Sequence, residues 1–77
     1  MDGSLYDGES FLTTGQYSIS SEDHHVTGSI AVCKVTNLLN RGHLTLQQEN
    51  GERLNIVPRR VQHSAGQLAI LMFVVEP

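Results

Sequence analysis

The chain has 77 residues, a length that allows one small domain. Hydrophobic residues make up 39% of it and charged residues 17%, a composition typical of a folded protein and not of a disordered one. No apolar run is long enough to cross a bilayer, and the polar, acidic first residues differ from a secretory signal. The single cysteine excludes an intrachain disulfide and a multi-cysteine zinc site. We therefore expect a cytoplasmic protein without membrane association.

Charge is unevenly distributed along the chain. Residues 1–23 carry five carboxylates and no Lys or Arg, a net charge of −5, whereas residues 24–77 carry five basic and three acidic residues, a net charge of +2. Residues 1–10 are rich in Gly, Ser and Asp and offer only Leu5 and Tyr6 as apolar anchors. This composition predicts a flexible acidic arm over residues 1–10 and a single small β domain over residues 11–77.

The first half of the predicted domain contains two strands. Alternation over residues 17–19 predicts a short strand, and the polar residues 20–28 indicate a loop. The β-branched run 30–35 predicts a strand that is apolar on both faces, in which Cys33 is a buried, unreactive thiol. Residues 38–42 then form a connection, with one helical turn that ends at Gly42.

A β-hairpin over residues 43–57 is the clearest local prediction. Two alternating segments flank the turn residues 49–52. A two-residue Asn50-Gly51 turn would place the apolar residues of the second strand opposite polar ones. A three-residue loop over 49–51 instead pairs Leu46 with Leu54 and Leu44 with Ile56. The apolar pattern selects this second register, with Gly51 at positive φ in a bulge.

The last third of the chain predicts a turn and a central strand. Pro58 cannot donate a ladder hydrogen bond, so we expect the preceding strand to end near Val57. Residues 58–66 then have the pattern of a short helical turn that stops at Gly66. Residues 68–75 are apolar without interruption, which favours a central strand that is buried on both faces.

Together these elements predict an all-β fold that admits one short helical turn. The architecture is a small antiparallel sheet or a partly open barrel of four to five strands. The order of hairpin, Pro-containing turn and terminal strand resembles SH3-like barrels in outline. This is a likeness of fold and implies no function.

The sequence offers no catalytic or metal-binding pattern. His24 and His25 follow two acidic residues, but the spacing to His43 and His63 matches no zinc site, and a solvated loop is the simpler interpretation. A nucleophile elbow and a phosphate-binding glycine loop are both missing. We therefore predict a protein that is not an enzyme and that needs no metal or cofactor.

Basic residues provide one candidate binding site. Arg59 and Arg60 are adjacent, and Arg41 and Arg53 are candidates to join them in contacting phosphates. The chain has few aromatic residues with which to stack bases. The alternative function is therefore a small nucleic-acid-binding barrel that uses Arg53, Arg59 and Arg60, with the acidic arm as an autoinhibitory competitor for that surface.

The favoured interpretation is a small non-catalytic protein-interaction or regulatory module. A lone small sheet leaves one face to cover, and a second copy of the chain is a common way to cover it. We therefore predict a homodimer and a protein partner of unknown identity, with nucleic acid the less favoured ligand. A partner that adds a strand to an open sheet edge is a third possibility. Alternate residues of the last strand form the predicted dimer contact: Leu68, Ile70, Met72 and Val74.

Overall fold

The computed structural model describes residues 1–33, 41–63, 66 and 68–76. These residues form six antiparallel strands: β1 (Asp2–Asp7), β2 (Ser10–Glu22), β3 (His25–Cys33), β4 (Leu44–Gln47), β5 (Arg53–His63) and β6 (Leu68–Val75). The all-β prediction is confirmed, and none of the described residues is helical. Accordingly, this part of the chain contains no helix long and apolar enough to span a membrane.

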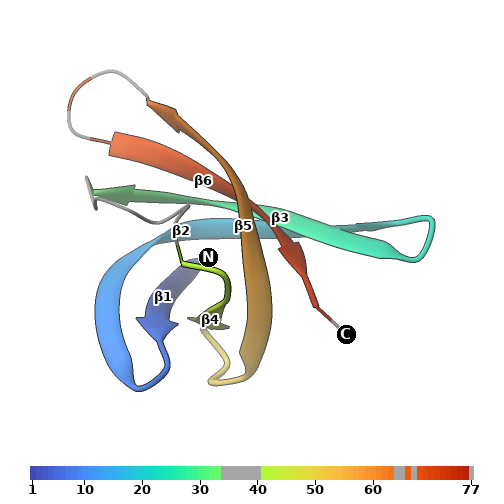
Figure 1. Cartoon of the computed structure of the whole chain (residues 1–77), viewed down its shortest axis with the longest axis horizontal. Helices are drawn as coiled ribbons and strands as arrows, with labels where there is room; N and C mark the ends of the chain where they lie inside the picture. Colours follow the sequence, from blue (N-terminus) through green and yellow to red (C-terminus); the bar gives the residue numbers. More distant parts are fainter. Residues whose placement is uncertain (34–40, 64–65, 67, 77) are drawn as a thin grey trace.

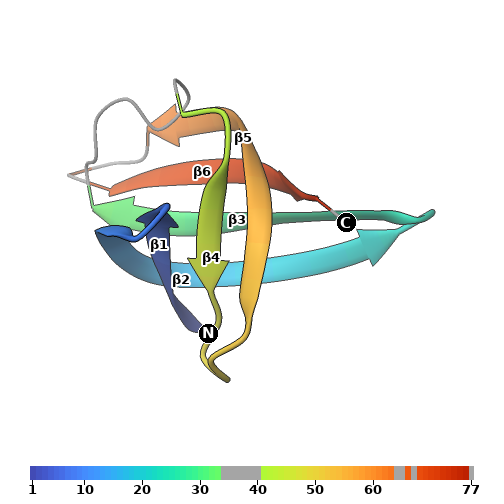
Figure 2. The ribbon, with the colours of Figure 1, turned by 60° about the horizontal axis from the view of Figure 1, so that its bottom comes forward.

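The strands close into a barrel in the order β1-β2-β3-β6-β5-β4 (Figure 1). Two three-stranded meanders, β1–β3 and β4–β6, join along β3–β6 and along β1–β4. Because β4 returns to lie beside β1, the first four strands form a Greek key (Figure 2). The barrel thus has six strands and is closed, where four to five strands and a partly open barrel were expected. The closed ring joins only parts of the longer strands: β2 beyond Gln16 pairs with β3 alone, and β5 beyond Ile56 pairs with β6 alone, so both strands keep an edge without a second partner strand among the described residues.

The interior of the barrel is filled by alternate residues of all six strands. Each strand points every second side chain inward, so that each strand contributes one to three residues to a shared core. The core side chains are at most 5% exposed: Leu5, Tyr17, Ile30, Val32, Leu44, Leu46, Ile56, Ala69, Leu71 and Phe73. The described part of the domain therefore builds its core from the barrel strands alone.

The first residues differ from the predicted flexible arm. Residues 2–7 form β1, which pairs with β2 on one side and with β4 on the other. The side chain of Leu5 is fully buried, and the Tyr17 amide donates a hydrogen bond to the Met1 carbonyl (2.8 Å). The pairing of this segment with two neighbours outweighs its polar composition. Its acidic residues are thus part of the barrel wall.

The polar segment 20–28 forms a hairpin, so the prediction of a loop was wrong. β2 continues to Glu22, which pairs with His25 at the start of β3. The two turn residues, Asp23 and His24, have φ angles of 48° and 68°. Two successive positive φ angles are the mark of a type I′ turn, whose twist matches that of the flanking strands.

The predicted hairpin between β4 and β5 is confirmed together with its register. Leu44 pairs with Ile56, and Leu46 pairs with Leu54. Gly51 has a φ of 91°, and its amide donates to the carbonyl of Gln48 (2.9 Å). The loop is therefore the expected three-residue turn with a bulge at glycine.

The segment after Pro58 is a strand, and the prediction of a helical turn there was wrong. β5 runs past Pro58 to His63 and pairs with β6 along most of its length. The register shifts between Pro58 and Arg60, so that Arg59 is the extra residue of a β-bulge. A bulge interrupts the ladder hydrogen bonds locally, which allows a proline inside the strand.

The central position of β6 is confirmed, but the burial of both its faces is not. β6 lies between β3 and β5, and its inward residues Leu71 and Phe73 are at most 2% exposed. The outward residues Leu68 and Met72 are 48% and 40% exposed. Cys33, which pairs with Leu68, is likewise exposed, contrary to the prediction of a buried thiol. The helical turn predicted for residues 38–42 lies mostly outside the described residues.

Candidate functional site

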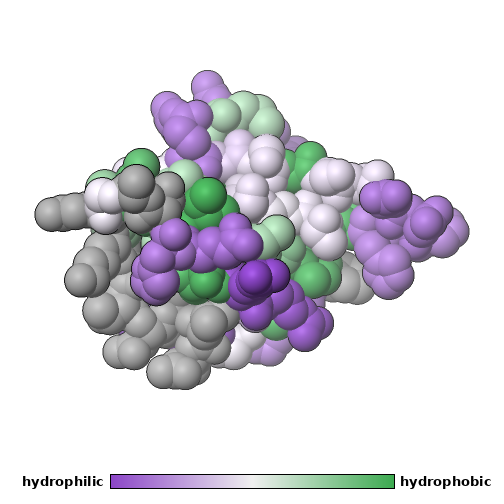
Figure 3. Space-filling view, turned by 90° about the horizontal axis from the view of Figure 1, so that it is seen from above, coloured by the Kyte–Doolittle hydropathy of each residue, from purple (hydrophilic) through white to green (hydrophobic). Residues whose placement is uncertain are grey.

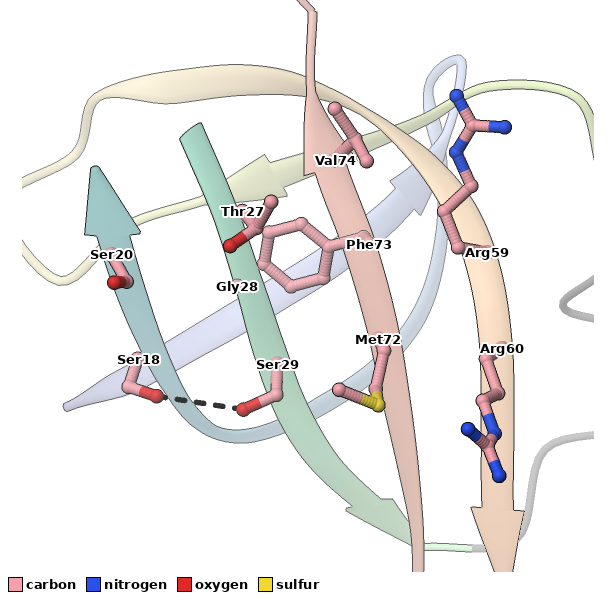
Figure 4. A pocket seen from close by; sticks show the side chains of 10 residues that line it. All are labelled: Ser18, Ser20, Thr27, Gly28, Ser29, Arg59, Arg60, Met72, Phe73 and Val74. Atoms are coloured by element: carbon pink, nitrogen blue, oxygen red, sulfur yellow. Dashed lines mark hydrogen bonds between the residues drawn. The ribbon is translucent and has the colours of Figure 1, made fainter. Parts of the chain in front are cut away.

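The strand register arranges the outward side chains of β2, β3, β6 and β5 in rows across one side of the barrel, here called the outer face. In the central row, Ser18 lies opposite Ser29, Ser29 opposite Met72, and Met72 opposite Arg60. Figure 4 shows this row, and the hydroxyl oxygens of Ser18 and Ser29 are 3.5 Å apart. Across the outer face, the side chains of this row are therefore hydroxyl-bearing on β2 and β3, apolar on β6 and basic on β5.

An apolar stripe follows β6 along this outer face. It consists of the four residues predicted for the dimer contact: Leu68, Ile70, Met72 and Val74. Leu68 and Met72 are exposed, and the other two are partly buried. Seen from above, hydrophobic side chains are exposed between strongly hydrophilic groups, and the β2–β3 hairpin forms a hydrophilic projection at the right (Figure 3). The stripe is thus an apolar surface on the outside of a barrel whose interior is already filled.

A shallow hollow of about 500 Å³ crosses the stripe at Met72 and Val74. Four hydroxyl groups line it on the β2–β3 side, those of Ser18, Ser20, Thr27 and Ser29, and Arg59 and Arg60 line it on the β5 side (Figure 4). The ring of Phe73 packs against Gly28, where a Cβ atom would lie 2.6 Å from the ring. The missing side chain at Gly28 therefore lets the aromatic ring fill the wall beneath the hollow.

The β-bulge of β5 brings the two neighbouring arginines to the hollow. Successive residues of a regular strand point to opposite faces, but the extra residue at Arg59 breaks this alternation. Both side chains are exposed and extend in different directions from β5 (Figure 4). Within the described ranges, neither forms an ion pair. The hollow thus has two guanidinium groups available for an external anion.

The other predicted arginines lie elsewhere on the barrel. Arg41 forms an ion pair with Asp7 of β1. The guanidinium carbon of Arg53 lies 5.1 Å from the centroid of the Tyr6 ring, at the opposite end of β5 from Arg60. Arg60 follows Arg53 by seven positions, a distance of roughly 23 Å along a strand. The structure therefore brings together only Arg59 and Arg60 of the four.

The acidic residues of the first 23 positions do not form an arm that reaches the hollow. Asp2 and Asp7 belong to β1, and Asp7 is paired with Arg41. Glu22 and Asp23 are exposed at the end of the β2–β3 hairpin. The first residues are therefore not a free segment, because the backbone of β1 is paired with β2 on one side and with β4 on the other.

The histidines are dispersed. His24 and His25 occupy the tip of the β2–β3 hairpin, His63 ends β5, and Nδ1 of His43 lies 3.1 Å from a carboxylate oxygen of Glu76. In the part of the chain that the structure describes, no three His, Cys, Asp or Glu side chains are close enough to hold a metal ion.

Two features of the surface were missed from the sequence. The four hydroxyls of the hollow occur at positions of matching alternation in β2 and β3, a signal hidden by the interpretation of 20–28 as a loop. The second feature is an aromatic cluster of Tyr6, Phe11 and Arg53, in which the two rings meet edge to face with centroids 5.7 Å apart. Tyr6 and Phe11 are direct partners in the β1–β2 hairpin, and the closure of the barrel through β4 brings Arg53 of β5 to the Tyr6 ring.

Comparisons with protein-family models, with curated proteins and with solved structures found no match to this chain.

Proposed function

We propose that the chain is a small non-catalytic protein-interaction module that works as a homodimer through the outer face of β6. The observation that carries this proposal is the apolar stripe. Leu68 and Met72 are 48% and 40% exposed although the barrel core is complete without them. Contiguous apolar surface that a fold does not need for its own core is typical of a contact site.

The size of the protein is compatible with such a contact. A standard interface covers about 800 Å² of each partner, roughly a sixth of the 5117 Å² surface of this chain. The stripe provides an apolar centre, and the hydroxyls and arginines around it provide a polar rim, which is the usual arrangement of an interface.

A second copy of the chain is the partner that the charges favour. The outer face carries Arg59 and Arg60, and the same molecule exposes Glu22 and Asp23 at a projecting hairpin. A two-fold dimer uses each of these groups twice. The exposed, free thiol of Cys33 supports a cytoplasmic location for this accessory or regulatory subunit, because such thiols stay reduced there.

The nucleic-acid alternative has weaker support. Of the arginines it requires, Arg53 is engaged with Tyr6 and lies far along β5 from Arg59 and Arg60. Tyr17 and Phe73 are core residues, so they are not available to stack with bases at the hollow.

The experiment that tests the proposed function compares two exposed apolar residues. Met72→Lys places a charge in the stripe, whereas Phe11→Lys places the same charge at an exposed apolar residue on β2, outside the stripe. We expect Met72→Lys to weaken dimerisation at least tenfold, because a buried unpaired charge is costly, and Phe11→Lys to leave it within about twofold of the original chain. Sedimentation equilibrium gives the dissociation constants, and circular dichroism confirms that both variants are folded. Equal effects of the two substitutions would contradict the proposal.

A further inference from the structure

We propose that the hollow on the outer face binds the acidic end of the β2–β3 hairpin of a second copy, with Glu22 and Asp23 of one chain against Arg59 and Arg60 of the other. This inference rests on the proposed homodimer and specifies how its two copies meet.

The β2–β3 hairpin projects beyond the barrel. The last pair that β3 forms with β6 is Thr27 with Val74, whereas β2 and β3 remain paired as far as Glu22 and His25 (Figures 1 and 2). From the Ser20–Thr27 pair to the Glu22–His25 pair the ladder advances two residues, about 7 Å, and the turn residues Asp23 and His24 lie beyond it. Both carboxylates are exposed on this projection. The type I′ turn gives the projection a defined shape, so little conformational entropy is lost when it is bound.

The hollow has the complementary chemistry. Its two guanidinium groups have no ion-pair partner among the described residues, and each is able to hold a carboxylate through two parallel hydrogen bonds. The hydroxyls of Ser20 and Thr27 are further donors, and Met72 and Val74 provide the apolar contact between them. Two arginines, neighbouring hydroxyls and an apolar strip suit a rigid β-hairpin that carries two carboxylates at its end.

The register makes the contact reciprocal. Glu22 and Arg60 both point to the outer face. Across the sheet, from β2 to β5, they are three strand spacings apart, about 14 Å. Along the strands, Glu22 lies four residues beyond the row that contains Arg60, about 13 Å. Their midpoint lies near Thr27 and Val74. A two-fold axis that passes over this midpoint, in the plane between two facing sheets, places Glu22 of one copy over Arg60 of the other. Each arginine pair then meets the carboxylates of the partner copy. Because the two separations are nearly equal, the strands of the copies cross at close to 90°, one of the two preferred angles of sheet packing.

The other surface cluster does not compete as the docking site for the hairpin. Arg53 lies over the ring of Tyr6, and Tyr6 packs on Phe11, so the cation there already has an aromatic partner. Asp7 and Glu9 lie in or beside the same β1–β2 turn and would repel an acidic hairpin. The arginines of the hollow have no such neighbours in their strand.

A charge-exchange experiment tests the inference on the full chain. One variant carries Arg59→Glu and Arg60→Glu, and the other carries Glu22→Lys and Asp23→Asn. Asparagine is chosen at position 23 because it tolerates the positive φ of the turn. We expect each variant alone to self-associate about tenfold more weakly than the original chain at low salt, and an equimolar mixture to form heterodimers within about threefold of the original affinity.

A control with the same charge change separates a specific contact from a general effect of net charge. Glu49→Lys with Glu52→Gln also changes the charge by +3, but both residues lie at the β4–β5 loop. This control is expected to dimerise within about twofold of the original chain. If the charge variants dimerise normally while Met72→Lys does not, the hairpin contact is overturned and the homodimer stands. If the original chain is monomeric at every concentration, both fail.

Discussion

Two sides of the barrel differ in whether their exposed side chains contact other groups of the same chain. Around β1, charged and aromatic groups are engaged within the chain: Arg41 with Asp7, Arg53 with the Tyr6 ring, and Tyr6 with Phe11. On the outer face around β6, two arginines and an apolar stripe have no such partners among the described residues. Exposure of a side chain alone therefore does not mark a contact surface. The informative feature is a set of complementary groups that the fold itself leaves unused.

The largest effect is expected inside β6. Leu71→Ala removes a fully buried core residue and is expected to lower the free energy of unfolding by about 2–5 kcal/mol. Met72→Ala, one residue along and pointing outward, is expected to lower it by less than about 1 kcal/mol for the isolated chain. Urea unfolding at a concentration where the chain is monomeric measures both. Equal losses would contradict the division of β6 into a core side and a contact side.

A smaller effect is expected beneath the hollow. In Gly28→Ala the new Cβ would lie 2.6 Å from both the Phe73 ring and the Ser18 carbonyl oxygen. Relief of these overlaps requires the ring or the strands to shift, and we expect a loss of about 1–3 kcal/mol in unfolding free energy. Thermal unfolding checks this. As a control, the new Cβ of Gly42→Ala has no atom of the described residues within 4 Å, and this variant is expected to unfold like the original chain.

The smallest effect is expected at the engaged side of the barrel. Arg53→Ala removes the cation over the Tyr6 ring, a contact at an exposed site that is worth about 0.5–1 kcal/mol. We expect the stability to fall by this amount and the dimer affinity to stay unchanged. Chemical unfolding and sedimentation on the same sample measure the two quantities. A loss of dimer affinity in Arg53→Ala would indicate that the dimer forms through the side of the barrel around β1 and not through the outer face around β6.

The local parts of the fold were predictable where side-chain pattern and turn chemistry agree. The β4–β5 hairpin is such a case, since the apolar residues allow only one register and Gly51 provides the positive φ. The β2–β3 hairpin was missed because its turn, Asp23-His24, lacks glycine. In β3, the inward-facing residue Gly28 also has no side chain, and the Phe73 ring of β6 occupies the space instead. Alternation therefore disappears from the sequence although it is present in the fold.

The remaining differences arise from contacts between distant segments. β1 offers the core only Leu5 as a large inward side chain, so its place in the barrel depends on pairing with β4 about 40 residues later. The bulge at Arg59 is defined by the register shift between β5 and β6, so it is visible only once the two strands are paired. The four residues of the apolar stripe were named as a dimer contact from the unbroken apolar run of the last strand, a pattern that does not distinguish the outward side chains from the inward ones. The hollow beside the stripe is lined by residues of four strands, and no single segment of the sequence could predict it.

The most direct test of the proposed homodimer is the mass of the unmodified chain in solution. Sedimentation equilibrium across low to high micromolar concentrations, in reducing buffer so that Cys33 cannot form a disulfide between chains, reports this mass. A homodimer predicts a transition from the 8.5 kDa chain to twice that mass, and added salt should weaken this association because ion pairs support the contact. A mass that stays at 8.5 kDa throughout this range would contradict the homodimer and leave the apolar stripe without the partner proposed for it.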